Sequence, residues 1–123
     1  MLNSSIKNVL IADDSATDRV NLSHTLEKLD LNVTSVKSGN KATIHAKGLQ
    51  PDVIFLDIIM DDGDGFHACR TLKRDDSTAE IPVIIVSSKS NRIDKLWAKK
   101  LGADAYVTKP FTDSDIVDAL NTL

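Results

Sequence analysis

The sequence predicts an α/β protein in which helices cover both faces of a parallel sheet. Short apolar stretches rich in Val and Ile alternate with stretches whose apolar residues recur every three or four positions. One of the short stretches, Val53 to Leu56, is apolar at every position, which is typical of a strand buried between two helix layers. Five such strands alternating with five helices make a doubly wound parallel sheet.

The expected strands differ in how deeply they should be buried. Four are mostly apolar, whereas residues 31–36 alternate apolar and polar side chains, which indicates a less buried strand or a sheet edge. The five strands cover residues 7–13, 31–36, 53–57, 81–86 and 104–108.

The expected helices are bounded by residues that favour helix ends. Ser15 is the expected N-cap of the first helix, and Gly39 and Asn40 break the chain before the second, which Pro51 ends. Gly102 is the expected C-cap of the fourth. The helices cover residues 15 to about 29, 41–49, 66 to about 74, 91–101, and a last segment that Thr112 or Asp113 begins.

The fourth expected helix carries both apolar and basic residues. Its apolar set is Ile93, Leu96, Trp97 and Leu101. We expect this set to pack at least partly on the core; alternatively Trp97 anchors a partner, since tryptophan is enriched at binding hot spots. The basic residues are Lys89, Arg92, Lys95, Lys99 and Lys100. They fit a solvated face or a docking surface for an acidic partner.

Composition limits the classes of protein to consider. The 123 residues suit one domain with one core, and no stretch approaches the ~20 apolar residues of a membrane span. The net charge of −3 argues against nucleic-acid binding by the domain as a whole, and Cys69 has no second cysteine to pair with. We therefore expect a single cytoplasmic domain over residues 1–123, without an output domain, nucleic-acid binding or membrane insertion.

Polar residues stand where four of the expected strands end. They are Asp13 with Asp14, then Asp57, Ser87 and Lys109. Right-handed crossovers place the carboxyl ends of all parallel strands on one edge, where ligands bind in such sheets. Taken alone, Asp57 could be a helix cap or a solvated loop acid, which is the commoner fate of a lone Asp. The four strand ends together indicate a functional site.

The residue types at this edge suit phosphoryl chemistry. Asp13, Asp14 and Asp57 are hard oxygen ligands of the kind that Mg²⁺ prefers, and they would repel one another without a cation. Lys109 supplies a second positive charge. A carboxylate with open access can attack phosphorus to form an acyl phosphate, while the ammonium, the Ser87 hydroxyl and backbone N–H groups stabilise the charge.

The chain resembles the CheY-like response-regulator receiver domain over essentially its whole length. The segments that carry the resemblance are LIADDS, PDVIFLDIIM, GDGF, IPVIIVSS and DAYVTKPF. The resemblance implies a flavodoxin-like sheet with strand order 2-1-3-4-5. It also implies that Asp57 is the phosphoacceptor, and that Mg²⁺ is bound by Asp13, Asp14, Asp57 and the backbone carbonyl of Ile59.

The resemblance assigns further roles at the same edge. Ser87 and Tyr106 match the switch residues, Lys109 matches the site lysine, and a cis peptide is implied at Lys109–Pro110. A downstream protein is expected to bind through residues 91–101, residues 104–108 and the last helix. The expected contact residues are Lys95, Trp97, Lys99 and Tyr106.

The function implied is that of a stand-alone response regulator in a two-component, chemotaxis-like phosphorelay. A CheA-like histidine kinase would phosphorylate Asp57, and the protein would be a monomer or weak dimer with no metabolic substrate. The segment SSKSNRIDKLWAKKLGADAYVTKP further resembles PilH-type regulators of type IV pilus twitching motility.

Other functions remain open at the level of sequence. The chain could drain phosphate from a kinase, or be a degenerate receiver that acts as an unphosphorylated interaction module. A haloacid-dehalogenase-like phosphatase would need a second Asp two residues after the nucleophile, where this chain has Ile59. The acidic residues Asp61, Asp62 and Asp64 depart from the family pattern. They fit a solvated turn, or alternatively altered divalent-ion binding.

Overall fold

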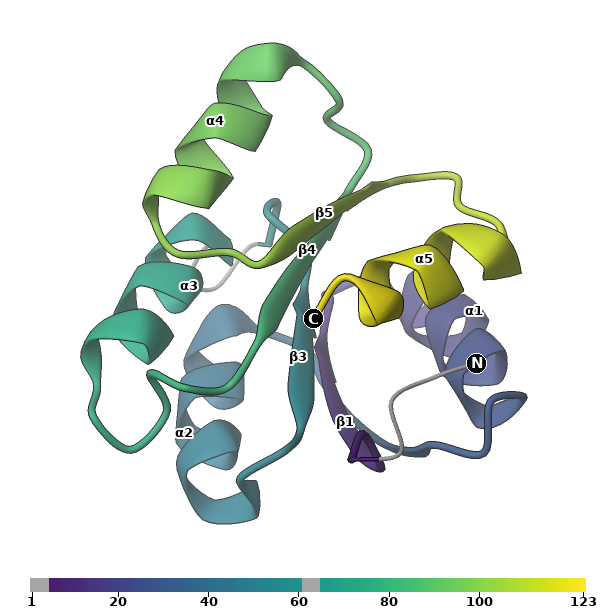
Figure 1. Cartoon of the computed structure of the whole chain (residues 1–123), viewed down its shortest axis with the longest axis horizontal. Coiled ribbons are helices and arrows are strands. Elements are labelled where there is room, and N and C mark those ends of the chain that lie inside the picture. The colour runs from purple at the N-terminus through teal and green to yellow at the C-terminus, as the bar shows by residue number, and fades with distance from the viewer. Residues whose placement is uncertain (1–4, 61–64) are drawn as a thin grey trace.

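The computed structural model describes residues 5–60 and 65–123 and contains one parallel sheet with helices on both faces (Figure 1). The strand order is β2-β1-β3-β4-β5, which confirms the predicted class and order. The strands are β1 (Asn8–Ala12), β2 (Asn32–Val36), β3 (Val53–Leu56), β4 (Val83–Ser87) and β5 (Ala105–Thr108). The helices are α1 (Ala16–Glu27), α2 (Gly39–Leu49), α3 (Gly65–Arg74), α4 (Arg92–Lys100) and α5 (Asp113–Asn121).

The sheet separates two apolar cores. In Figure 1, α1 and α5 lie on one face of the sheet, and α2, α3 and α4 lie on the other. Successive strand residues point to opposite faces, so Ile54 packs in the core under α2 and α3 while Phe55 packs in the core under α1 and α5. The side chains of β3 are buried on both faces, as expected for a central parallel strand.

The edge strand and most helix ends agree with the sequence. β2 lies at the edge of the sheet, and Ser15 caps α1 by accepting a hydrogen bond from the Asp18 N–H. Thr112, rather than Asp113, caps α5, and Asp115 completes a capping box. The start of α2 was predicted wrongly: Ser38 is its N-cap, so Gly39 and Asn40 form the first turn instead of preceding the helix.

Only one residue of the predicted apolar set packs on the core: Leu101, the C-cap of α4, contacts the core under α2 and α3, whereas the other three are exposed. Ile93 is 77% exposed, and Leu96 and Trp97 are each 51% exposed. Ala98 is the buried residue of this helix, and α4 lies beside β5, which is the last strand of the sheet. Trp97 therefore does not pack on the core, and its role as an anchor for a partner stays a prediction.

The end of α4 shows why glycine follows it. Leu101, rather than the predicted Gly102, is the C-cap, and Gly102 follows it with a φ of 100°, a conformation that glycine adopts without steric cost. The Gly102 and Ala103 N–H groups donate to the carbonyls of Lys99 and Ala98, which is the Schellman arrangement. None of the helices in residues 5–60 and 65–123 is long and apolar enough to cross a membrane.

Burial of Cys69 makes a pH-dependent contribution to stability. Burial raises the pKa of this thiol from 9.0 to about 11, so the folded protein keeps a proton that the unfolded chain releases above pH 9. The protonated Cys69 thiol therefore contributes about 2 kcal/mol to the free energy of unfolding below pH 9. This contribution is lost as the pH rises toward 11. Urea unfolding from pH 8 to pH 11 should show this additional loss in the wild type but not in Cys69→Ala. Parallel pH profiles would contradict the assignment.

Candidate functional site

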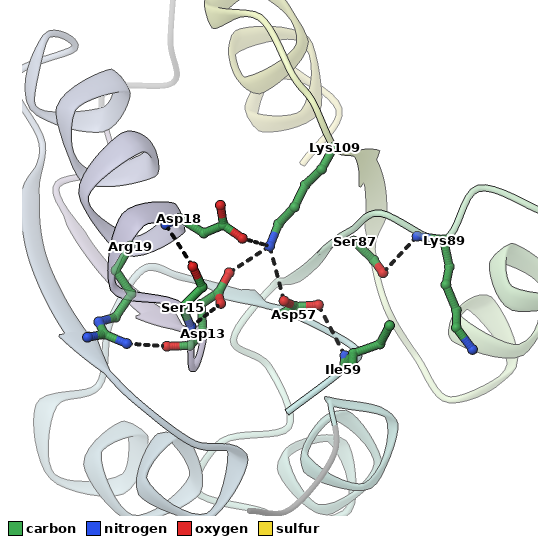
Figure 2. A network of polar contacts seen from close by, with 9 residues as sticks. All are labelled: Asp13, Ser15, Asp18, Arg19, Asp57, Ile59, Ser87, Lys89 and Lys109. Atoms are coloured by element: carbon green, nitrogen blue, oxygen red, sulfur yellow. Dashed lines mark hydrogen bonds and ion pairs between the residues drawn. The ribbon is translucent and has the colours of Figure 1, made fainter. Parts of the chain in front are cut away.

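The carboxyl edge of the sheet brings three carboxylates and an ammonium together (Figure 2). Asp13 and Asp14 follow β1, Asp57 follows β3, and one oxygen from each lies within 4.8 Å of the others. Lys109 follows β5, and its Nζ lies 2.8 Å from Asp13 Oδ2 and 3.0 Å from Asp57 Oδ2. The parallel topology thus joins residues that are up to 96 positions apart in the chain.

Main-chain donors fix the orientation of two of these carboxylates. The Ser15 N–H donates to Asp13 Oδ1 at 2.9 Å, and the Ile59 N–H donates to Asp57 Oδ1 at 3.1 Å. Each carboxylate therefore has one oxygen held by the backbone and the other bonded to Lys109. The Arg19 guanidinium also donates to the main-chain carbonyl of Asp13, at 2.7 Å, and holds the first loop against α1.

Sequence reasoning missed one member of the site, Asp18. Its Oδ2 lies 2.7 Å from Lys109 Nζ, so the ammonium contacts three carboxylates. Asp18 stands in the first turn of α1 rather than at a strand end, which is why the search along strand ends did not find it. The pattern Ser15-Ala16-Thr17-Asp18 could have drawn attention to it as a capping-box signature.

Burial and charge act against each other on the ionisable groups. Burial raises the pKa of Asp57, and hydrogen bonds from the Ile59 N–H and Lys109 oppose this effect. For Lys109, burial alone would lower the pKa, but the hydrogen bonds to Asp13, Asp18 and Asp57 outweigh it and raise the pKa above its usual range. Lys109 is therefore a firmly held cation at neutral pH.

The three clustered carboxylates suit a divalent cation. Asp13, Asp14 and Asp57 offer hard oxygen atoms close enough together to share one ion, and this donor set contains no nitrogen or sulfur. Mg²⁺ fits such a set because it binds few carboxylates and retains water ligands. The backbone carbonyl of Ile59 stays a predicted ligand, and the acidic residues Asp61, Asp62 and Asp64 lie outside the described residues.

The two predicted switch residues are connected through Lys89. The buried Ser87 hydroxyl accepts a hydrogen bond from the Lys89 N–H at 3.1 Å, and the Tyr106 hydroxyl donates to the Lys89 carbonyl at 2.7 Å. The Ser87 side chain is thus bonded to the loop before α4 while its carbonyl accepts from the Lys109 N–H at 2.8 Å. The predicted cis peptide at Lys109–Pro110 is confirmed.

Three of the four residues expected to contact a partner line one groove. Lys95, Lys99 and Tyr106 line a shallow groove of about 300 Å³ between α4 and β5. The Lys95 ammonium lies 5.8 Å from the centre of the Tyr106 ring, within range of a cation–π contact. Trp97 is exposed on α4 but is not among the residues that line this groove.

Gly65 packs directly against the main chain of the site. A Cβ atom at this position would lie 1.9 Å from the Asp57 carbonyl oxygen and 2.8 Å from the Ile58 Cα. The Gly65 N–H also donates to the Ile58 carbonyl at 2.9 Å. The start of α3 can therefore approach the end of β3 only because residue 65 has no side chain.

Comparisons with known proteins agree on one family. The sequence model of one protein family, the response regulator receiver domain, matches residues 9–121. Protein PilH of Pseudomonas aeruginosa is 38% identical over 94% of this chain and 95% of its own length, and Protein PilG of the same organism is 33% identical over 91% of this chain and 83% of its own. The solved structure of chemotaxis protein CheY4 from Vibrio cholerae matches with a TM-score of 0.88 at 26% identity, covering 94% of this chain and 97% of that one.

Substituting Gly65 should disturb the site as well as the fold. In Gly65→Ala, the backbone after Asp57 must move, because the new methyl group meets main-chain atoms that cannot rotate away. We expect a loss of about 1–3 kcal/mol in urea unfolding, together with weaker Mg²⁺ binding. Gly48→Ala is the control: it lies in α2 with no atom within 4 Å of the new Cβ, and should be neutral or stabilising. Equal effects of the two substitutions would contradict this account.

Proposed function

The chain belongs to the response regulator receiver family, and on this premise we propose that it is a phosphorylation-dependent signalling switch. The observation that carries the proposal is the contact of Lys109 with Asp57 inside a cluster of carboxylates at the carboxyl edge of the sheet. This arrangement combines an oxygen nucleophile, a metal-ligand set and a fixed cation, which are the parts that phosphoryl transfer to a carboxylate requires.

We propose that Asp57 receives the phosphoryl group from a phosphohistidine of a histidine kinase. A carboxylate oxygen of Asp57 attacks the phosphorus atom, the P–N bond breaks, and its electron pair goes to the imidazole nitrogen of the donor. The product is an acyl phosphate on Asp57. Mg²⁺, held by Asp13, Asp14 and Asp57, with the Ile59 carbonyl as a further ligand, would neutralise charge on the phosphoryl oxygens.

The residues around Asp57 support a route from the modification to the surface. A phosphoryl group on Asp57 adds charge that attracts the Lys109 ammonium and the Ser87 hydroxyl. Ser87 would then release the Lys89 N–H, and the same Lys89 main chain holds the Tyr106 hydroxyl. A change at Ser87 would therefore reach Tyr106 through one shared residue and shift a two-state equilibrium.

The proposed partners are a CheA-like kinase and a downstream protein that binds α4, β5 and α5. The exposure of Trp97 and the basic residues of α4 supports a docking role for this helix. Similarity to PilH and PilG supports a place in a chemotaxis-like phosphorelay of type IV pilus twitching motility. In this role the protein acts in the cytoplasm and has no metabolic substrate.

The test of the proposal is phosphorylation of Asp57 itself. The wild type, incubated with acetyl phosphate and Mg²⁺, should gain one hydroxylamine-labile phosphoryl group by mass spectrometry, and Asp57→Asn should gain none, since its amide is not a nucleophile. Asp76→Asn is the control, because this exposed residue follows α3 at the opposite edge of the sheet. Normal phosphorylation of Asp57→Asn would overturn the assignment. No phosphorylation of the wild type would favour an unphosphorylated interaction module.

A further inference from the structure

All three N–H donors of the Lys109 ammonium are used in this arrangement. A lysine ammonium has three N–H groups, and Lys109 Nζ has three carboxylate oxygens at 2.7–3.0 Å, from Asp13, Asp18 and Asp57. For Lys109 to bind an oxygen of a phosphoryl group, one of these contacts must weaken or be exchanged.

The three contacts differ in how easily they can be exchanged. The side chains of Asp13 and Asp57 are 7% and 10% exposed, and each is also held by a main-chain N–H. The Asp18 side chain is 39% exposed and stands on α1 beside a groove of about 500 Å³ between this helix and residues 109–111. Asp18 can turn toward water without leaving a buried charge unpaired, whereas Asp13 cannot, and Asp57 itself carries the added group.

We propose that Asp18 is a positioning residue that competes with the phosphoryl group for the Lys109 ammonium and so limits how tightly the site holds that group. This inference rests on the proposed function. Asp18 also adds a fourth negative charge beside Asp13, Asp14 and Asp57, which further disfavours an incoming anion.

A purely structural role for Asp18 predicts the opposite result. If Asp18 only aimed Lys109 at the site, its removal would leave the ammonium less well placed, and anion binding would weaken. If Asp18 competes, removal of its charge frees one N–H of Lys109 and strengthens anion binding. The direction of the change therefore separates the two roles.

The experiment uses beryllofluoride, an anion that takes the place of a phosphoryl group on a carboxylate, at saturating Mg²⁺. Its dissociation constant is measured by ¹⁹F NMR or calorimetry for the full chain. Asp18→Asn should bind the probe about two- to fivefold more tightly than the wild type, the range expected when a part-exposed ion pair is removed. Asp18→Glu, which retains the charge, should stay within about twofold of the wild type.

Glu27→Gln is the matched control, because it removes one negative charge from the same helix about 13 Å further along its axis. It should leave the dissociation constant unchanged, and urea unfolding verifies that all variants are folded. Unchanged or weaker binding by Asp18→Asn overturns the role of Asp18 while leaving the proposed function intact. A wild type that does not bind the probe overturns the proposed function, and this inference with it.

Discussion

The contact between the Lys109 ammonium and the carboxylates around it is the interaction on which the carboxyl edge depends. Two carboxylate oxygens within 4.8 Å of each other, each carrying a full charge, repel by at least about 3 kcal/mol at an effective dielectric constant of 20. The sheet topology forces Asp13 and Asp57 into this proximity, because both follow central strands that pair with each other. The Lys109 ammonium offsets this repulsion by forming ion pairs with both carboxylates, and a bound divalent cation would offset more of it.

Hydrogen bonds and close packing connect these charged groups to neighbouring loops at the same edge of the sheet. Gly65 allows α3 to start against the Asp57 carbonyl, which fixes the loop that carries the Ile59 N–H. On the other side, the main chain of Lys89 bonds to both Ser87 and Tyr106. These contacts are few and local, so a single added group on Asp57 could alter several of them together.

The sheet and the polar residues at the strand ends could be predicted from the sequence, because both follow from short-range patterns. The apolar run of β3 and the alternation of β2 distinguished a central from an edge strand, and parallel topology then placed Asp13, Asp57 and Lys109 together. Asp18 was missed because its contact with Lys109 depends on how the first turn of α1 is oriented relative to the end of β5. That orientation is set by packing rather than by local sequence.

The misjudged apolar face of α4 has a similar origin. Periodicity shows that Ile93 and Trp97 share one side of a helix, but not whether a sheet lies under that side. Both side chains are exposed beside the last strand of the sheet, and the small Ala98 is the buried residue instead. Gly39 begins α2 because Ser38 is a favourable N-cap, a local signal that outweighs the low helix propensity of Gly39 and Asn40.

The most direct test of the central claim is the Mg²⁺ dependence of stability in Lys109→Met. If the ammonium and the metal offset the same carboxylate repulsion, removing Lys109 lowers the free energy of unfolding by about 3–5 kcal/mol without Mg²⁺. Saturating Mg²⁺ should then stabilise the variant more than it stabilises the wild type. An equal increment in both proteins would show that the metal and Lys109 act on separate charges, and would contradict this account of the site.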